Sequence, residues 1–217
     1  MRLYLLLLTF LATSASSAHA WELTALGGIN YASPTDRDVN GTHSWTGNAA
    51  VDYGVSAAFQ IFDSPFELEG AAFILSSEIQ GSVNNHDTVQ KMKALHFPLL
   101  VRFNFDPWVS LAAGGYLSSG TGSVVTFTDG IPNSQSYSAA GLENIDAGLL
   151  IGLKAKLHFT PEISFVFDVR YQHGLQNLET TSPYVYNTRS VQALAGIGFQ
   201  FITPPPSKDH ANFEVHE

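Results

Sequence analysis

Apolar and polar residues alternate with a period of two along most of this chain. In the stretch ISFVFDVRYQ, residues 163–172, apolar and aromatic side chains occupy the odd positions, and every even position except Val166 is polar. Such alternation is typical of a β-strand whose two faces meet different surroundings. Most such segments have 11 residues or more, close to the roughly 9–11 that a tilted strand needs to cross a bilayer. Eight segments show the pattern: 21–31, 48–62, 66–79, 93–105, 108–119, 144–159, 162–173 and 190–201.

The connections between these segments alternate between short and long. Short turns with Asp, Thr or Pro follow the second, fourth and sixth segments, at 63–65, 106–107 and 160–161. Long polar connections are expected at 32–47, 80–92, 120–143 and 174–189. An even strand count with short turns on one side and long loops on the other is the layout of bacterial outer-membrane barrels. The pattern predicts an all-β, eight-stranded antiparallel up-and-down transmembrane β-barrel with both termini on the periplasmic side.

The two faces of the predicted strands differ in charge. One face mixes small residues with charges of both signs, which suits the interior of an eight-stranded barrel that side chains just fill. We therefore expect Phe165 and Phe167 to face lipid, and Asp168 and Arg170 to point inward. The charges on the inward face are Asp52, Glu67, Glu69, Arg102, Asp146, Lys154, Lys156, Asp168 and Arg170. The uncharged face carries Val51, Tyr53, Val55, Leu95, Phe97, Leu99, Val101, Leu149, Ile151, Leu153, Ala193, Ala195 and Ile197.

Aromatic residues gather at two heights along the predicted strands, as expected at the two interfaces of a membrane. Toward the long loops lie Tyr31, Trp45, Tyr116 and Tyr171. Near the short turns lie Phe59, Phe62, Phe66, Phe103, Phe105, Trp108, Phe159, Phe165, Phe199 and Phe201. A soluble barrel has no physical reason to place rings at two levels.

The ends of the chain are expected to lie outside the barrel. Residues 1–20 combine Arg2, an apolar run from Leu3 to Leu11 and an Ala-His-Ala site, which predicts a cleaved signal peptide rather than a retained anchor. The barrel is then 21–201. Residues 202–217 contain three consecutive prolines and are polar, which predicts a disordered periplasmic tail or, alternatively, a tether for a periplasmic partner.

Composition supports a membrane protein without disulfides. The chain of 217 residues has no cysteine, and its charged fraction of 13% is about half the roughly 25% of soluble domains. Loss of the signal removes one of the 10 bases and leaves 9 against 19 acids. That acidic balance argues against nucleic acid as a partner.

Five stretches follow one another across 21–201: HFPLLVRFNF, PWVSLAAGGYL, DAGLLIGLKAKL, FVFDVRYQHGLQNL and LAGIGFQF. In their order and spacing they resemble the outer membrane protein beta-barrel domain family, including its PorT-like members. The chain also resembles the small barrels of outer membrane proteins A, X and W. The resemblance implies an eight-stranded barrel in the cell outer membrane, contact with its lipids and lipopolysaccharide, and no catalytic residues. Such barrels end on an aromatic residue for the barrel assembly machinery; Phe201 matches it, although a tail follows.

Two motifs invite a functional interpretation. His173 lies in a strand resembling that of lipid A deacylase barrels, but these have a Ser two residues on, where this chain has Leu175; the following Asn is displaced to Asn177. A Ser–His pair needs the hydroxyl within reach of the imidazole, so we expect no esterase activity.

Asp36, Asp38 and Asn40 match the start of a calcium loop. Its twelfth position, Gly47, lacks the required Glu, and an ordinary loop turn is favoured over weak Ca²⁺ binding.

The inward charges allow two interpretations, a structural network of ion pairs or a conducting pore, and the narrow lumen favours the network. His43, His86, His96 and His158 have no metal-ligand spacing, and no metal or cofactor is expected. The sequence predicts a non-enzymatic barrel whose long loops make surface contacts, with a host or extracellular ligand, or support envelope integrity. Two alternatives stay open: a channel for small solutes or hydrophobic compounds, and a secreted soluble lipocalin-like binding barrel.

Overall fold

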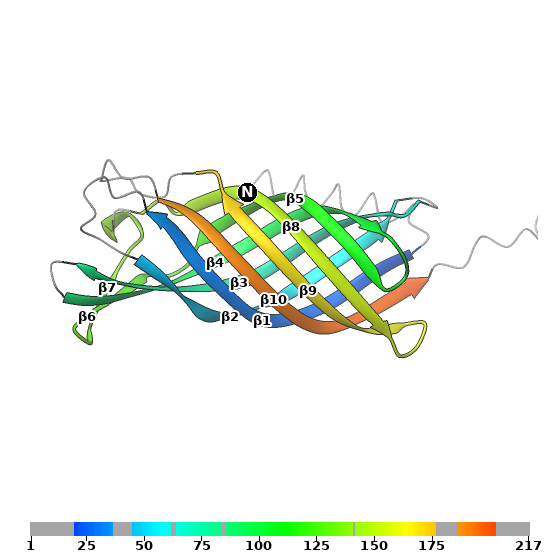
Figure 1. The fold of residues 1–217 in the computed structure, drawn as a ribbon, viewed down its shortest axis with the longest axis horizontal. Coiled ribbons are helices and arrows are strands. Elements are labelled where there is room, and N and C mark those ends of the chain that lie inside the picture. The colour runs from blue at the N-terminus through cyan, green and yellow to red at the C-terminus, as the bar shows by residue number, and fades with distance from the viewer. Residues whose placement is uncertain are drawn as a thin grey trace, which may run out of the picture.

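Eight long strands form one antiparallel sheet that closes into a barrel. The computed structural model describes residues 20–36, 45–61, 64–83, 86–140, 142–176 and 186–202. Every neighbour in chain order pairs, and β10 pairs back with β1, so the predicted eight-stranded up-and-down barrel is confirmed. The strands run at a tilt to its long axis (Figure 1). They are β1 (Ala20–Asp36), β2 (Trp45–Gln60), β3 (Phe66–Val83), β4 (His86–Asn104), β5 (Val109–Gly120), β8 (Ile145–His158), β9 (Ile163–Gly174) and β10 (Tyr186–Ile202).

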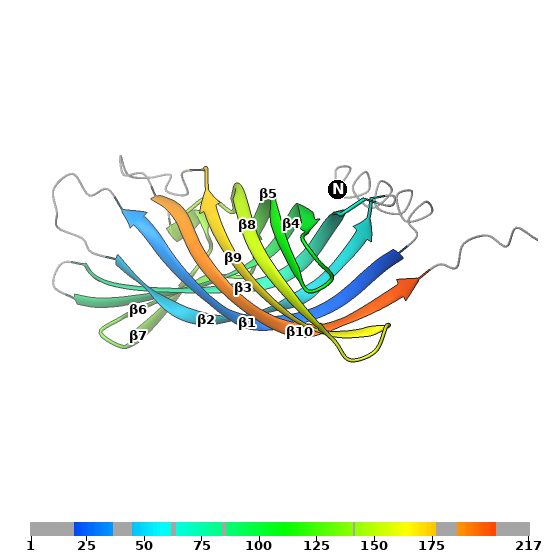
Figure 2. The same ribbon diagram turned by 45° about the vertical axis from the view of Figure 1, so that its right-hand side comes forward.

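The strands are longer at the long-loop end than the alternation predicts. The segment 80–92 is not a loop, because β3 and β4 remain paired up to Val83 and His86. Nor is 120–143 only a loop: it contains β6 (Val124–Thr128), β7 (Ile131–Gln135) and a short 3₁₀ helix, Ser138–Ala140. Strand β6 pairs with β4 beyond the point where β5 leaves it. These strands form an extracellular extension at one end of the barrel (Figures 1 and 2).

The opposite end of the barrel carries the short turns and the described ends of β1 and β10 (Figure 1). The turn after β4 is held by Asp106, whose Oδ1 accepts hydrogen bonds from the backbone N–H groups of Trp108 (2.6 Å) and Val109 (2.8 Å). This self-bonding is the reason that Asp favours turns. Short turns lie on the periplasmic side of outer-membrane barrels, which places the β6–β7 end outside the cell.

The orientation of the two faces is confirmed. Asp168 and Arg170 are fully buried, whereas Phe165 and Phe167 are 40% and 49% exposed on the outer wall. The residues predicted to face lipid are exposed along their strands, except for Phe97, which is half-buried. The apolar side chains therefore surround the barrel and the charges fill it. Within the described residues, no helix has the length and apolar character needed to cross a membrane.

Aromatic residues lie on the outer wall toward both ends of the barrel, as predicted, but one residue assigned to a belt, Tyr116, does not lie there. Tyr31 and Tyr171 are exposed on the outer wall toward the extracellular end, and Trp21 stacks on Phe201 at 4.0 Å toward the other end. Tyr116 does not belong to a belt, because it points into the lumen and is 6% exposed. Trp45 and Phe62 lie where the structure describes no side chains.

Among the described strand pairs of the barrel wall, the register shifts between β2 and β3. Backbone pairing between β2 and β3 stops after Asn48 and resumes at Tyr53 with a shifted register. Between these points the side chain of Asp52 accepts the N–H of Ser76 at 2.8 Å, and Asn30 Nδ2 donates to the Ser76 carbonyl at 3.2 Å. Two inward side chains thus replace the backbone partners that β2 would otherwise supply, as happens at a β-bulge.

Candidate functional site

The lumen is the first candidate for a functional site, and a network of ion pairs fills its middle. Glu69 is the centre: its carboxylate accepts hydrogen bonds from Arg102, from Lys154 Nζ at 2.7 Å and from Arg170 at 2.7 Å. Asp168 accepts from Arg102 at 2.6 Å and from Arg170 at 2.8 Å. All five residues are fully buried. The predicted structural network is therefore present, and its members come from β3, β4, β8 and β9.

A second group of ion pairs lies beside the first. Lys156 Nζ contacts Glu22 at 2.8 Å and Glu67 at 3.8 Å, and Lys154 Nζ lies 3.8 Å from Glu22. The two groups together contain four bases and four acids, so their formal charges cancel. Buried charges are tolerated when they are paired and hydrogen-bonded in this way. The ionic network of the lumen thus consists of Glu22, Glu67, Glu69, Arg102, Lys154, Lys156, Asp168 and Arg170.

Next to the network the lumen contains apolar and neutral polar side chains. A cluster of Leu26, Phe73, Leu75, Val166 and Leu194 packs there, and the Arg170 guanidinium lies 5.1 Å from the centre of the Phe73 ring. Gln172 donates to Gln192 at 2.6 Å, and Gln192 donates to Asp52 at 2.9 Å. This series of hydrogen-bonded amides ends at the carboxylate of Asp52, which also accepts the backbone N–H of Ser76. Because Gln172 follows Arg170 toward the extracellular end of β9, these amides lie between the network and the extracellular mouth.

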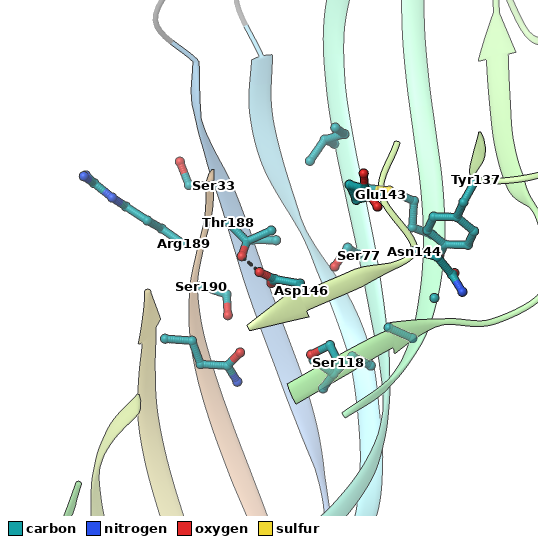
Figure 3. A pocket seen from close by; sticks show the side chains of 17 residues that line it. Ser33, Ser77, Ser118, Tyr137, Glu143, Asn144, Asp146, Thr188, Arg189 and Ser190 are labelled. Atoms are coloured by element: carbon teal, nitrogen blue, oxygen red, sulfur yellow. Dashed lines mark hydrogen bonds between the residues drawn. The ribbon is translucent and has the colours of Figure 1, made fainter. Parts of the chain in front are cut away.

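The extracellular mouth contains a small cavity of about 100 Å³. Asp146, Thr188 and Ser118 point into it, and Tyr137 and Asn144 lie at its rim (Figure 3). Thr188 donates to Asp146 at 2.7 Å, the bond drawn in Figure 3. A cavity of this size holds a few water molecules, well below a drug-sized ligand.

Tyr137 fixes the rim of this cavity. Its hydroxyl donates to the Lys93 carbonyl oxygen at 2.5 Å, and its ring lies so close to Gly120 that a Cβ there would be 2.5 Å from it. Burial raises the pKa of the Tyr137 phenol, so the group stays a neutral donor. The connection that follows β7 is thereby attached to β4.

Tyr116 is a lumen residue that the sequence analysis misplaced. Its hydroxyl donates to Asp146 at 3.1 Å and lies 3.3 Å from Thr188 Oγ1. Gly148 makes room for it, because a Cβ at that position would lie 2.6 Å from the Tyr116 hydroxyl. Tyr116 is thus part of the polar group that forms the floor of the mouth.

We expect Tyr116→Phe to lower the free energy of unfolding by about 1–2 kcal/mol, because Asp146 loses a donor in a partly buried site. Tyr31→Phe is the matched control, since Tyr31 is 46% exposed on the outer wall. It should change stability by less than about 0.5 kcal/mol. Urea unfolding of the refolded barrel in detergent, followed by tryptophan fluorescence, measures both. Equal effects of the two variants would contradict the assignment of Tyr116 to the lumen.

A buried Ser–His pair is a second feature that the sequence analysis missed. His96 Nδ1 lies 2.7 Å from Ser118 Oγ, and the His96 ring is 4.9 Å from that of Tyr116. His96 Nε2 is buried without a hydrogen-bond partner among the described residues. A catalytic base of this kind is normally oriented by a third group on its other nitrogen. The pair therefore lacks the arrangement of a serine hydrolase. The one sequence signal for this pair is that His96 on β4 and Ser118 on β5 both occupy even-numbered, inward-facing positions.

The motifs singled out in the sequence do not form a common site. His173 lies on the outer wall near the end of β9, and Leu175 follows it with 62% exposure. Asp36 ends β1, whereas Asp38, Asn40, Asn177 and His43 lie outside the described residues. His86 contacts Asp129 at 2.5 Å in the extension, and His158 packs edge-on against Trp108. No group of three or more potential metal ligands occurs in the part of the chain that the structure describes.

The closed sheet, the apolar outer wall and the ionic lumen define a membrane-spanning β-barrel protein. The chain belongs to the outer membrane protein beta-barrel domain family, whose model matches residues 3–201. It is therefore a protein of the cell outer membrane, and the predicted family is confirmed. The soluble lipocalin-like alternative is wrong, because the ionic residues are inside and the apolar ones outside.

Several solved structures of outer-membrane proteins are similar to this chain. Neisserial surface protein A is 18% identical with a TM-score of 0.50, and the match covers 84% of this chain and 99% of that one. The attachment invasion locus protein Ail of Yersinia pestis is 13% identical with a TM-score of 0.44, covering 83% and 98%. The outer membrane protease OmpT of Escherichia coli is 9% identical with a TM-score of 0.49, covering 85% and 98%. No curated protein matches the sequence.

Proposed function

We propose that this protein is a non-enzymatic outer-membrane barrel that binds partners at the cell surface through its extracellular end. The observation that carries the proposal is the contrast between a filled lumen and a large extracellular extension. The five-residue centre of the ionic network is fully buried, so the middle of the barrel offers no space to a ligand. Binding residues concentrate on the loops of rigid scaffolds, and here the scaffold is the barrel.

The extension offers an accessible surface. Strands β3 and β4 have 18 and 19 residues, well beyond the roughly 9–11 that the membrane requires. Strand β6 adds to β4 and β7 adds to β6, and all five residues of β7 are exposed. Pro132 on β7 removes a backbone donor from the outer edge, which limits pairing with another strand. We infer that partners contact the side chains of this sheet and the flanking loops.

The filled lumen and the ends of the barrel chain each lead to an expectation. A channel would require the ionic network to open, so we expect no stable conductance when the barrel is placed in a planar bilayer. The exposed Phe201 beside Trp21 at the end of β10 is our candidate for recognition by the assembly machinery. Residues 1–20 as a signal peptide and 202–217 as a periplasmic tail stay predictions, because only Ala20 and Ile202, the ends of β1 and β10, lie within the described residues.

Replacement of residues 124–135 by a four-residue Gly-Ser linker tests the proposed surface role. Because β6 and β7 lie outside the barrel ring, we expect the variant to keep its heat-modifiable migration on gels. Loss of the fully buried Val124 should lower the free energy of unfolding by about 1.5–3 kcal/mol. Binding of the barrel in nanodiscs to an epithelial monolayer should fall at least tenfold. The same linker inserted at residues 160–161, in a periplasmic turn, is the control and should bind normally. Unchanged binding by the 124–135 variant would contradict the role of this sheet.

A further inference from the structure

The lysines and arginines of the described residues divide into two groups. Four of the seven, Arg102, Lys154, Lys156 and Arg170, lie in the lumen network. The other three, Lys91, Lys93 and Arg189, are exposed on the outer wall and all lie toward its extracellular end. Within the described residues, the bases of the membrane-facing wall therefore lie at one height, although the whole chain has a formal charge of −9.

That height is the upper edge of the apolar band. Along β4 the outward residues Val101, Leu99 and Leu95 are apolar and exposed, and Lys93 and Lys91 follow directly. Along β10 the outward Val191 precedes Arg189 in the same direction, and Arg189 points away from the mouth cavity in Figure 3. Residues just above the apolar band of an outer-membrane barrel lie among the headgroups of the outer leaflet.

Lys91 and Lys93 border an open hollow of about 520 Å³ on the outer wall. Two irregularities of the sheet create it. On one side the β2–β3 pairing is interrupted between Asn48 and Tyr53, and on the other β4 changes its partner from β5 to β6. The volume lies in the range of roughly 300–1,000 Å³ that small-molecule sites occupy. The wall residues Ala50 and Ser76 and the connection Thr121–Ser123 line this hollow.

The charges of this hollow favour an anionic group. Glu78 is the one acid among its lining residues, and it is already bound by Lys91 at 2.9 Å. Lys91 Nζ also lies 5.6 Å from the centre of the Phe127 ring, which holds that side chain over the hollow. Lys93 is exposed and adds a second positive charge. Phe127 and Val125 supply an apolar border on the extracellular side.

We propose that this hollow binds the phosphate group of a phosphorylated glycolipid of the outer leaflet, that is, lipopolysaccharide. Lys93 is the principal cation, Lys91 is shared between the phosphate and Glu78, and Phe127 packs against the sugar. The position above the apolar band, the net positive charge and the volume together select a lipid headgroup. The two lysines lie on the barrel wall and not on the exposed face of β7, although Phe127 and Val125 belong to β6, so the test changes the lysines alone and leaves the β6–β7 hairpin intact.

The test uses the refolded wild-type barrel in phosphatidylcholine nanodiscs that contain purified bisphosphorylated lipid A. Retention of lipid A is measured by native mass spectrometry. The double variant Lys91→Gln/Lys93→Gln should bind about 25-fold more weakly, because a base near a membrane surface contributes about fivefold. Arg189→Gln is the matched control, since Arg189 lies at a similar height but on a strand on the opposite side of the ring.

Two further measurements distinguish recognition of the lipid A phosphate from general attraction to a lipid. Dephosphorylated lipid A should bind the wild type as weakly as bisphosphorylated lipid A binds the double variant. Phosphatidylglycerol in excess should not displace lipid A. Equal retention by the double variant, equal retention of the dephosphorylated lipid, or displacement by phosphatidylglycerol would each overturn the proposal. A normal epithelial-binding result for the double variant separates this site from the proposed role of the β6–β7 hairpin.

Discussion

Glu69→Gln is expected to lower the free energy of unfolding by about 3–5 kcal/mol, the usual cost of removing one partner of a buried ion pair. Glu69 is bonded to Arg102, Lys154 and Arg170, all fully buried. After the substitution these three bases face Asp168 as the one remaining acid of the inner group. The change is nearly isosteric, so the loss reports on charge rather than on packing.

Glu78→Gln is the matched control for this prediction. Glu78 also forms an ion pair with a lysine, at 2.9 Å, but the two side chains are 27% and 51% exposed. Exposed pairs contribute about 0–1 kcal/mol. Guanidinium unfolding of both variants in detergent micelles measures the difference. Combining Glu69→Gln with Lys154→Met should recover part of the loss, since it removes one uncompensated base. Equal destabilisation by Glu69→Gln and Glu78→Gln would show that the lumen is hydrated enough to screen its charges.

The orientation of the wall could be predicted from the sequence because it depends on parity alone. In β9 every second residue changes sides, so the alternation of Phe165, Phe167 and Asp168 fixes which residues face lipid. The same rule places Tyr116 inside, because it continues the inward series of Ala112 and Gly114 on β5. The preference of tyrosine for membrane interfaces suggested otherwise. Parity is the stronger criterion where the two disagree.

The extension could not be predicted from alternation. Beyond the apolar band, apolar and polar side chains do not alternate along residues 86–93 of β4, so this segment has no apolar side to contrast with a polar one. The sequence pattern then does not indicate a strand, and a paired strand is predicted as a polar loop. The partners within the lumen were equally hidden, because Lys154 and Glu69 are 85 residues apart and meet only through the register of the closed sheet.

Ile151→Lys provides the most direct test of lipid contact at the centre of the wall. Ile151 lies at the middle of β8 and is 56% exposed on the outer face. A lysine at the midplane of a bilayer costs about 2–4 kcal/mol, whereas one near an interface costs about 0–1 kcal/mol. Ile145→Lys is the matched control, because Ile145 begins the same strand at its extracellular end and is 49% exposed.

We expect Ile151→Lys to fold into phospholipid vesicles with a free energy reduced by about 2–4 kcal/mol and Ile145→Lys to fold almost normally. Folding is followed by the gel shift between boiled and unboiled samples and by urea titration at fixed lipid concentration. The difference depends on hydrocarbon around β8, since an exposed lysine on a water-facing wall would carry little cost at either position. Two variants of equal stability in vesicles would therefore contradict the placement of Ile151 in the membrane, and with it the orientation from which the ionic lumen follows.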